Sequence, residues 1–336
     1  MRSYHRLIVA LVAAGSVAAA GCGSSDGASG NSTKKVSLSL VSYSTPQAAF
    51  VKIIKDFQAT DAGKGVTFSQ SYGASGDQSR AVVAGLKADV VEFSLEPDMT
   101  RLVKANKVAA GWNRNAHRGM VTNSVVVIAT RKGNPKALKC WSDLTRPGVQ
   151  VITPNPFTSG GARWNVMAGY GAQSAKGANK VAGVAYLHAL FKNVPVQDDS
   201  ARKALGTFTN GKGDAMLAYE NEAIFAQQNG QKLDYVVPDS TILIENPVAV
   251  TSTSKNPEEA KAFVDFLYST TAQKEFAASG YRPVVSGVAA GKFPTPSGLF
   301  TISDLGGWTS VSKEFFDPAK SVMADVERKL GVSTNK

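Results

Sequence analysis

The stretch NPFTSGGARWN, residues 155–165, places a threonine, a serine and two glycines between a strand-like run and a helix-like run. The first N–H groups of a helix have no partner within the helix, and they carry the positive end of its dipole. Glycine lets a ligand approach this backbone closely, and a serine hydroxyl adds a further donor. The residue types at this junction therefore predict a binding site for an anion.

Three other junctions have the same character: SYSTPQ at 42–47, SYGASGDQ at 71–78 and DDSARK at 198–203. Each places serine, threonine or glycine where a helix is expected to begin, and Ser75 and Gln78 have the spacing of a capping box. Serine and threonine are also ordinary N-caps, so a single junction of this kind carries little information. Four such junctions, two of them rich in glycine, favour one shared pocket for an oxyanion.

Strand-like and helix-like runs alternate along the chain, which predicts an α/β fold with largely parallel sheets. Hydrophobic residues alternate with serines at the start of 36–43, whereas 46–57 and 256–270 have hydrophobic residues at helical spacing. In open α/β sheets, ligands bind beyond the carboxyl ends of the strands. The four junctions are expected to lie there.

The N-terminus has the pattern of a bacterial secretion signal. Two arginines precede a hydrophobic run at residues 7–20, which is shorter than a comfortable membrane span of about 20 residues. The run ends in AAGC, so 1–21 resembles a lipoprotein signal peptide and Cys22 the residue that carries the lipid; ordinary secretion is the alternative. The Gly/Ser-rich segment 22–35 is expected to be a flexible tether. Removing the two arginines lowers the net charge from +11 to +9.

The sequence offers little for catalysis, metal binding or nucleic-acid recognition. The segment GASGD at 73–77 lacks the last glycine of a nucleophile elbow, and only His117 and His188 lie beyond the signal as possible partners. No cysteines and histidines have the spacing of metal ligands, and no cofactor is expected. The lysines are scattered, which disfavours nucleic acid as a partner. We therefore expect a non-enzymatic protein. We also expect it to be a monomer.

Segments spread over nearly the whole body, from residue 36 to residue 320, resemble the sulfate/thiosulfate-binding proteins of ATP-driven (ABC) importers. They include NPFTSGGARWN, QSYGASGDQSRAVVAGLKADVV, GDAMLAYENEA and LFTISDLGGW. The resemblance implies a periplasmic-binding-protein-like fold of type II. In that fold two α/β lobes, each with a largely parallel sheet flanked by helices, enclose the ligand in the cleft between them.

The resemblance also implies lobe boundaries. Lobe one would comprise residues 36–121 plus 250–330, and lobe two would comprise 125–243. The chain would cross between the lobes near 121–128 and again near 243–250.

Seven residues would hold the anion, according to the same resemblance. Lobe one would supply backbone N–H groups, and lobe two would supply N–H groups, one serine hydroxyl and one side-chain donor. The residues are Ser44, Ser75, Ser159, Gly160, Gly161, Ala201 and Tyr219. Sulfate-specific members usually carry tryptophan where this chain has Tyr219, which leaves the role of this side chain open.

The function implied is capture of sulfate or thiosulfate outside the cytoplasm and delivery to the membrane permease subunits of an ABC importer. The protein would be anchored to the cell membrane through lipid on Cys22. Another tetrahedral oxyanion such as molybdate stays open as the ligand. A surface-anchored sensor or adhesion module on the same fold stays open as the function.

Overall fold

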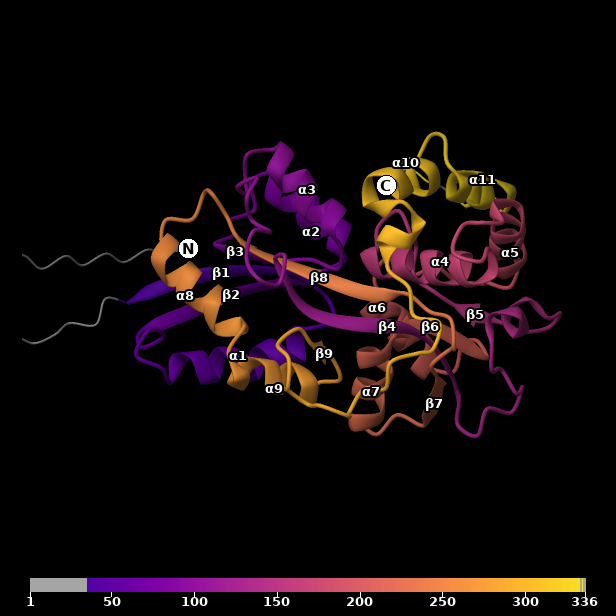
Figure 1. Ribbon diagram of the computed structural model, residues 1–336, viewed down its shortest axis with the longest axis horizontal. Helices are drawn as coiled ribbons and strands as arrows, with labels where there is room; N and C mark the ends of the chain where they lie inside the picture. The colour runs from indigo at the N-terminus through magenta and orange to yellow at the C-terminus, as the bar shows by residue number, and fades with distance from the viewer. Residues whose placement is uncertain (1–34, 333, 335–336) are drawn as a thin grey trace, which may run out of the picture. The chain divides into compact units, whose positions relative to one another are not determined.

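Figure 1 shows the computed structural model, which describes residues 35–332 and 334. The described residues belong to one compact unit. The predicted signal peptide at 1–21 lies outside them, as does the predicted tether at 22–35 except for its last residue. No helix in the described part of the chain is both long and hydrophobic enough to cross a membrane.

Lobe one is built on a sheet formed by the earliest strands. β1 (Val36–Tyr43) pairs in parallel with β2 (Val66–Gly73) and with β3 (Val90–Glu92). β3 pairs antiparallel with the last residues of β8 (Leu243–Val250). The three parallel strands agree with the sequence prediction, and their carboxyl ends point in one direction.

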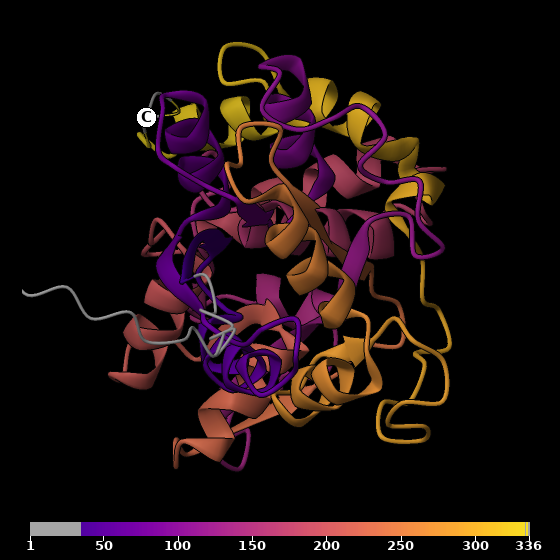
Figure 2. The same cartoon turned by 90° about the vertical axis from the view of Figure 1, so that its left-hand side faces the viewer.

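Helices cover both faces of this sheet (Figures 1 and 2). On one face, α1 (Gln47–Gln58), α8 (Pro257–Leu267) and α9 (Thr270–Ala278) bury phenylalanines that recur at helical spacing. On the other face, α2 (Ser75–Val83) and α3 (Glu96–Lys104) pack through smaller aliphatic side chains. Both α2 and α3 begin just after the carboxyl ends of the strands that precede them.

Lobe two has a mixed sheet. β5 (Val151–Ile152) pairs in parallel with β6 (Ala215–Tyr219), whereas β4 (Met120–Arg131) runs antiparallel to β6 and to β7 (Leu233–Val236). The expectation of a largely parallel sheet therefore describes lobe one better than lobe two. The difference arises because β4 enters from lobe one and runs against the direction of its neighbours.

Two pairs of helices flank the sheet of lobe two. α4 (Gly160–Gln173) and α5 (Lys180–Lys192) lie on one face. α6 (Ala201–Thr209) and α7 (Glu220–Gln228) lie on the other. Of these helices, α4 and α6 begin at two of the junctions that the sequence singled out.

The lobes are joined by an antiparallel ribbon of two long strands. The first half of β4 pairs with the first half of β8, and the second half of β4 pairs with β6 and β7. The last residues of β8 pair with β3. The two strands therefore occupy the segments 121–128 and 243–250 in which the crossings were expected. A short strand, β9 (Arg282–Pro283), also pairs with β4.

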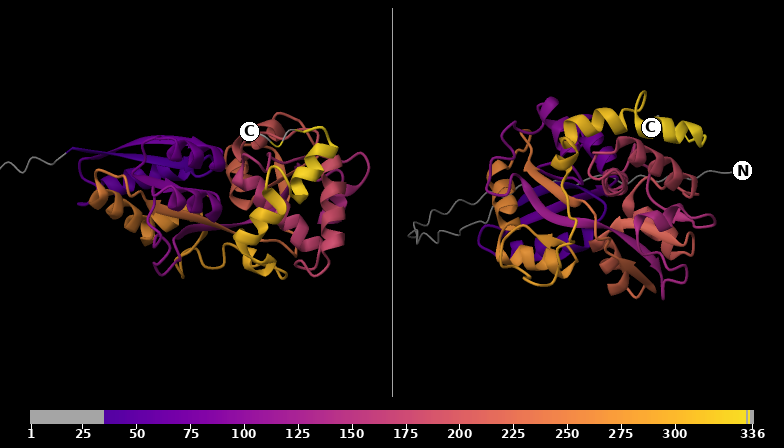
Figure 3. Two further views of the ribbon diagram at one scale, coloured as in Figure 1. Left: turned by 90° about the horizontal axis from the view of Figure 1, so that it is seen from above. Right: turned by 45° about the vertical axis from the view of Figure 1, so that its right-hand side comes forward.

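The C-terminal segment packs differently from the expectation that 250–330 belongs wholly to lobe one. From Phe300 onward, with α10 (Gly307–Phe316) and α11 (Val322–Lys329), it lies against α4 and α5 of lobe two (Figure 3). The ring centroids of Trp164 and Trp308 are 4.7 Å apart. The reason is that α4 is buried around nearly its whole circumference, so its outer face needs a cover.

Candidate functional site

The helix-start junctions of both lobes meet at one small, buried cavity. The space open to the centre of a water-sized sphere is about 10 Å³. The lining residues are Tyr43, Ser44, Thr45, Ala74, Ser75, Ser94, Ser159, Gly160, Gly161, Ala201 and Tyr219. The structure thus brings together all seven residues that the resemblance implies for the anion, from segments far apart in the chain.

Three helices direct their N-termini at this cavity. Ser75 is the first residue of α2, Gly160 is the first residue of α4, and Ala201 is the first residue of α6. Among the described residues, the N–H groups of these three residues, of Gly161 and of Ser44 have no hydrogen-bond acceptor. Converging helix ends with free N–H groups form a region of positive potential without any ionised side chain.

The local sequence explains why α4 begins where it does. The Ser159 hydroxyl oxygen accepts a hydrogen bond from the N–H of Ala162 at 3.4 Å, which caps the helix. Its own proton has no acceptor among the described residues and is available to a ligand. The neighbouring Thr158 differs, because its hydroxyl donates to the carbonyl oxygen of Asp199 at 2.9 Å.

Ser75 takes part through its backbone only. Its hydroxyl donates to Asp98 Oδ2 at 2.6 Å and accepts from the N–H of Ser94 at 3.0 Å. The capping box predicted from Ser75 and Gln78 is therefore wrong: the N-cap is Ala74, and no side chain caps α2. The carboxylate of Asp98 captures the hydroxyl that a capping box would use.

Tyr219 ends β6, and its side chain is buried at the cavity. Its hydroxyl lies 2.6 Å from Ser94 Oγ, within a hydrogen bond in which either atom is the donor. Burial raises the pKa of Tyr219 well above its usual range, so the phenol keeps its proton. The hydroxyl of Tyr43, another lining residue, is buried and has no partner among the described residues.

No carboxylate lines the cavity, and one ion pair beside it is buried. Arg202 donates to both carboxylate oxygens of buried Glu222, at 3.1 and 2.8 Å, and to the carbonyl oxygen of Thr45 at 2.9 Å. Desolvation raises the pKa of Glu222, and Arg202 opposes that rise. The groups that face the cavity itself are therefore backbone N–H groups and hydroxyls.

Several contacts hold the lobes together around the cavity. Trp164 Nε1 of lobe two donates to the carbonyl oxygen of Ser94 at 2.8 Å. Arg282, after α9, forms a buried ion pair with Glu220 of α7 at 2.8 Å. Both contacts join residues that are far apart in the chain.

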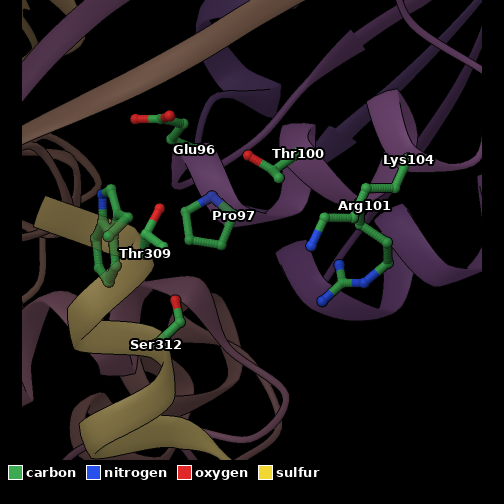
Figure 4. A pocket seen from close by; sticks show the side chains of 8 residues that line it. Glu96, Pro97, Thr100, Arg101, Lys104, Thr309 and Ser312 are labelled. Atoms are coloured by element: carbon green, nitrogen blue, oxygen red, sulfur yellow. The ribbon is translucent and has the colours of Figure 1, made fainter.

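A wider groove lies between α3 and α10, with about 330 Å³ open to the centre of a water-sized sphere (Figure 4). Pro97 lies beside Thr309, while Arg101 and Lys104 lie further along α3. Arg101 is already paired with Asp98 at 2.6 Å, and Glu96 brings a negative charge to the groove. These features make it a poorer anion site than the small cavity. In the described part of the chain, no group of three or more His, Cys, Asp or Glu residues could hold a metal ion.

Four lining residues were missed by sequence reasoning. Tyr43 and Thr45 flank Ser44, and Ala74 precedes Ser75, so they follow from their neighbours. Ser94 had its own signal, since it stands just beyond the carboxyl end of β3, where ligands of α/β sheets bind. No glycine or helix-cap pattern marks Ser94, so the pattern shared by the four junctions does not include it.

Comparisons with known proteins give consistent results. Residues 38–282 match a family described as bacterial extracellular solute-binding protein. The chain is 43% identical to the sulfate-binding protein of Synechococcus elongatus, over 91% of each chain, and 34% identical to the thiosulfate-binding protein of Escherichia coli, over 82% of this chain and 86% of that one. The solved structure of the sulfate-binding protein SubI from Mycobacterium tuberculosis H37Rv is 45% identical, with a TM-score of 0.82, over 84% of this chain and 100% of that one.

Proposed function

Because this chain belongs to the bacterial extracellular solute-binding proteins, we propose that it captures sulfate, or thiosulfate, outside the cytoplasm for uptake by an ABC transporter. The observation that carries the proposal is the cavity in which free N–H groups of three helix ends converge without a carboxylate. Ser44, Ser75, Ser159, Gly160, Gly161, Ala201 and Tyr219 are the proposed binding residues. The similarity to named sulfate- and thiosulfate-binding proteins supports the same ligand class.

The mechanism follows from solvation. A dianion that leaves water loses many kcal/mol of hydration unless donors meet its oxygens. Each hydrogen bond to a charged group recovers about 1.5–3 kcal/mol. Because the donors come from both lobes, an anion in the cavity stabilises the closed arrangement over an open one. A closed protein is then the form that a membrane permease recognises.

Selectivity follows from the same donor set. Sulfate carries no proton at neutral pH and needs donors only, whereas phosphate keeps a proton and needs an acceptor. The cavity offers amide N–H groups and hydroxyls and has no carboxylate in its lining. We expect sulfate to be selected over phosphate on this ground.

Membrane attachment through lipid on Cys22 is the second part of the proposal. It rests on the sequence pattern of residues 1–22, since these residues are not described. Anchoring and binding should be separable, so Cys22→Ala is expected to release a soluble protein that still binds its anion. A variant that stayed in the membrane fraction after washing without detergent would contradict the anchor.

Calorimetric titration of the purified protein tests the proposal. We expect saturable binding of sulfate or thiosulfate to one site, and no comparable binding of phosphate; titration with molybdate tests the alternative ligand. The thiosulfate-binding relatives are the reason to test both sulfur anions in parallel. If neither sulfate nor thiosulfate binds saturably, the proposed function is refuted. In that case, deletion of the gene should not change growth with sulfate as the only sulfur source.

A further inference from the structure

Ser94 and Tyr219 form a buried pair of hydroxyls at the cavity. Their oxygens are 2.6 Å apart, both residues line the cavity, and they come from different lobes. Each hydroxyl has one proton, and the bond between them uses only one of the two. The pair therefore has one proton left for another acceptor.

The backbone of Ser94 is fixed from three directions. Its N–H donates to the Ser75 hydroxyl at 3.0 Å. Its carbonyl oxygen accepts from Trp164 Nε1 at 2.8 Å and from Asn246 Nδ2 at 2.9 Å. These partners belong to lobe one, lobe two and the connecting strand β8. Ser94 is thus held rigidly where both lobes meet, which suits a residue that must place a proton accurately.

The chemistry of the two hydroxyls decides which of them donates to the other. A phenol is a stronger acid than an alcohol and a weaker acceptor, so the favoured arrangement has Tyr219 donating to Ser94 Oγ. The Ser94 proton is then free. Since no acceptor for it is found among the described residues other than Tyr219, the proton can point to a ligand in the cavity.

We propose that Ser94 supplies a hydroxyl hydrogen bond to the bound anion and that Tyr219 is a positioning residue, which orients Ser94 by donating to its oxygen. The inference rests on the proposed function, because it assumes an oxyanion in this cavity. In this arrangement the side-chain donor to the anion is Ser94 and not Tyr219. Tyr219 acts on the anion only through its hydrogen bond to Ser94. A chain of two hydroxyls also strengthens the terminal donor, because each hydrogen bond polarises the next.

The test compares Ser94→Ala, Tyr219→Phe and the double variant by calorimetric titration with sulfate and thiosulfate. Ser94→Ala should weaken binding of the preferred anion about ten- to a hundredfold, since one hydrogen bond to a buried charge is lost. Tyr219→Phe should weaken it less, by about fivefold or under, because Ser94 still donates. Within the Ser94→Ala background, Tyr219→Phe should add little, because its effect passes through Ser94.

Two controls separate binding from folding. Ser174→Ala removes another fully buried serine hydroxyl, at the far end of α4 from the cavity, and should leave affinity unchanged. Thermal unfolding without anion checks that each variant is folded. If Ser94→Ala is unstable, Ser94→Cys keeps the size of the side chain with a weaker donor and should bind with intermediate affinity.

Three results would overturn the inference. A larger loss in Tyr219→Phe than in Ser94→Ala would make the tyrosine the direct donor. If both single variants bind almost as the wild type does while Ser159→Ala binds weakly, the anion site is correct but the hydroxyl pair is not part of it. Absence of saturable sulfate or thiosulfate binding in the wild-type protein would instead refute the proposed function itself, and the inference with it.

Discussion

The N–H of Gly76 donates to the carbonyl oxygen of Thr158 at 3.2 Å. This bond joins the first turn of α2 in lobe one to the residue before the N-cap of α4 in lobe two. A Cβ at Gly76 would lie 2.8 Å from that oxygen, so only glycine allows the approach. Two of the helix ends that face the cavity are therefore in direct backbone contact when the lobes are closed.

The two glycines of α4 should differ when each is replaced by alanine. A Cβ at Gly160 would lie 2.6 Å from Leu95 Cδ2 and 2.7 Å from Ser94 Cβ, whereas at Gly161 the nearest atom would be 3.4 Å away. Gly160→Ala should therefore hold the lobes apart and weaken sulfate binding about tenfold or more. Gly161→Ala should have an effect of about threefold or less. Titration of both variants checks the order, and equal affinities would show that lobe contact at Gly160 does not control binding.

Ser159 and Thr158 provide a second matched pair. The Ser159 proton is free to reach a ligand, while the Thr158 hydroxyl is bonded to the carbonyl oxygen of Asp199. Ser159→Ala should raise the dissociation constant ten- to over a hundredfold, in keeping with about 1.5–3 kcal/mol for a charged hydrogen bond. Thr158→Ala should cost folding stability more than affinity. An unchanged dissociation constant for Ser159→Ala would exclude its hydroxyl as a ligand donor.

Glu92 predicts a dependence of stability on pH. It lies on β3, which pairs with β1 and β8, and its side chain is fully buried; Oε2 accepts from the Ser42 hydroxyl at 2.8 Å, and Oε1 has no partner among the described residues. Desolvation raises its pKa from 4.5 to about 8. The folded protein therefore keeps a proton that the unfolded chain loses above pH 4.5. The resulting stabilisation is complete below that pH and is lost as the pH rises through about 8.

The variant Glu92→Gln isolates this effect, because glutamine has a similar shape and does not titrate. Between pH 5 and 8 the wild-type free energy of unfolding should fall relative to the variant by about 1.4 kcal/mol per pH unit. Urea denaturation at several pH values measures the slope. Glu258→Gln, at an exposed position, is the control and should run parallel to the wild type. If the free energy of unfolding of Glu92→Gln also runs parallel to that of the wild type across this pH range, Glu92 is ionised in the folded protein.

Sequence reasoning identified the junctions that line the cavity because the signals of a helix start are local in the sequence. The free N–H groups belong to helix starts, and serine and glycine mark such starts in the sequence, as at Ser159 and Gly160. The Ser94–Tyr219 bond could not be found in this way, since the partners are 125 residues apart and meet only across the lobe interface. The C-terminal helices α10 and α11 were assigned to lobe one for the same reason, because their packing partners in lobe two are distant in the sequence. The hydrophobic face of α10 predicts burial but does not say that α4 will cover it.

The anion preference should follow the absence of a carboxylate acceptor in the cavity lining. At pH 7 we expect phosphate to compete with sulfate at least about a hundredfold more weakly, since its proton would leave an unmet donor at the cost of about 3 kcal/mol. Competition titration measures this ratio directly. Comparable affinities for the two ions would mean that an acceptor reaches the ligand, and the assignment of donors would need revision.

The position of the bound anion is the most direct test of the central claim, that free helix-end amides of both lobes hold a tetrahedral dianion. Selenate has the charge and shape of sulfate, and anomalous scattering locates its selenium in a crystal grown without other oxyanions. The prediction is one selenate in the cavity, with its oxygens within hydrogen-bond distance of the N–H groups of Ser75, Gly160 and Ala201. Selenate bound elsewhere, with this cavity empty or filled by water, would contradict it.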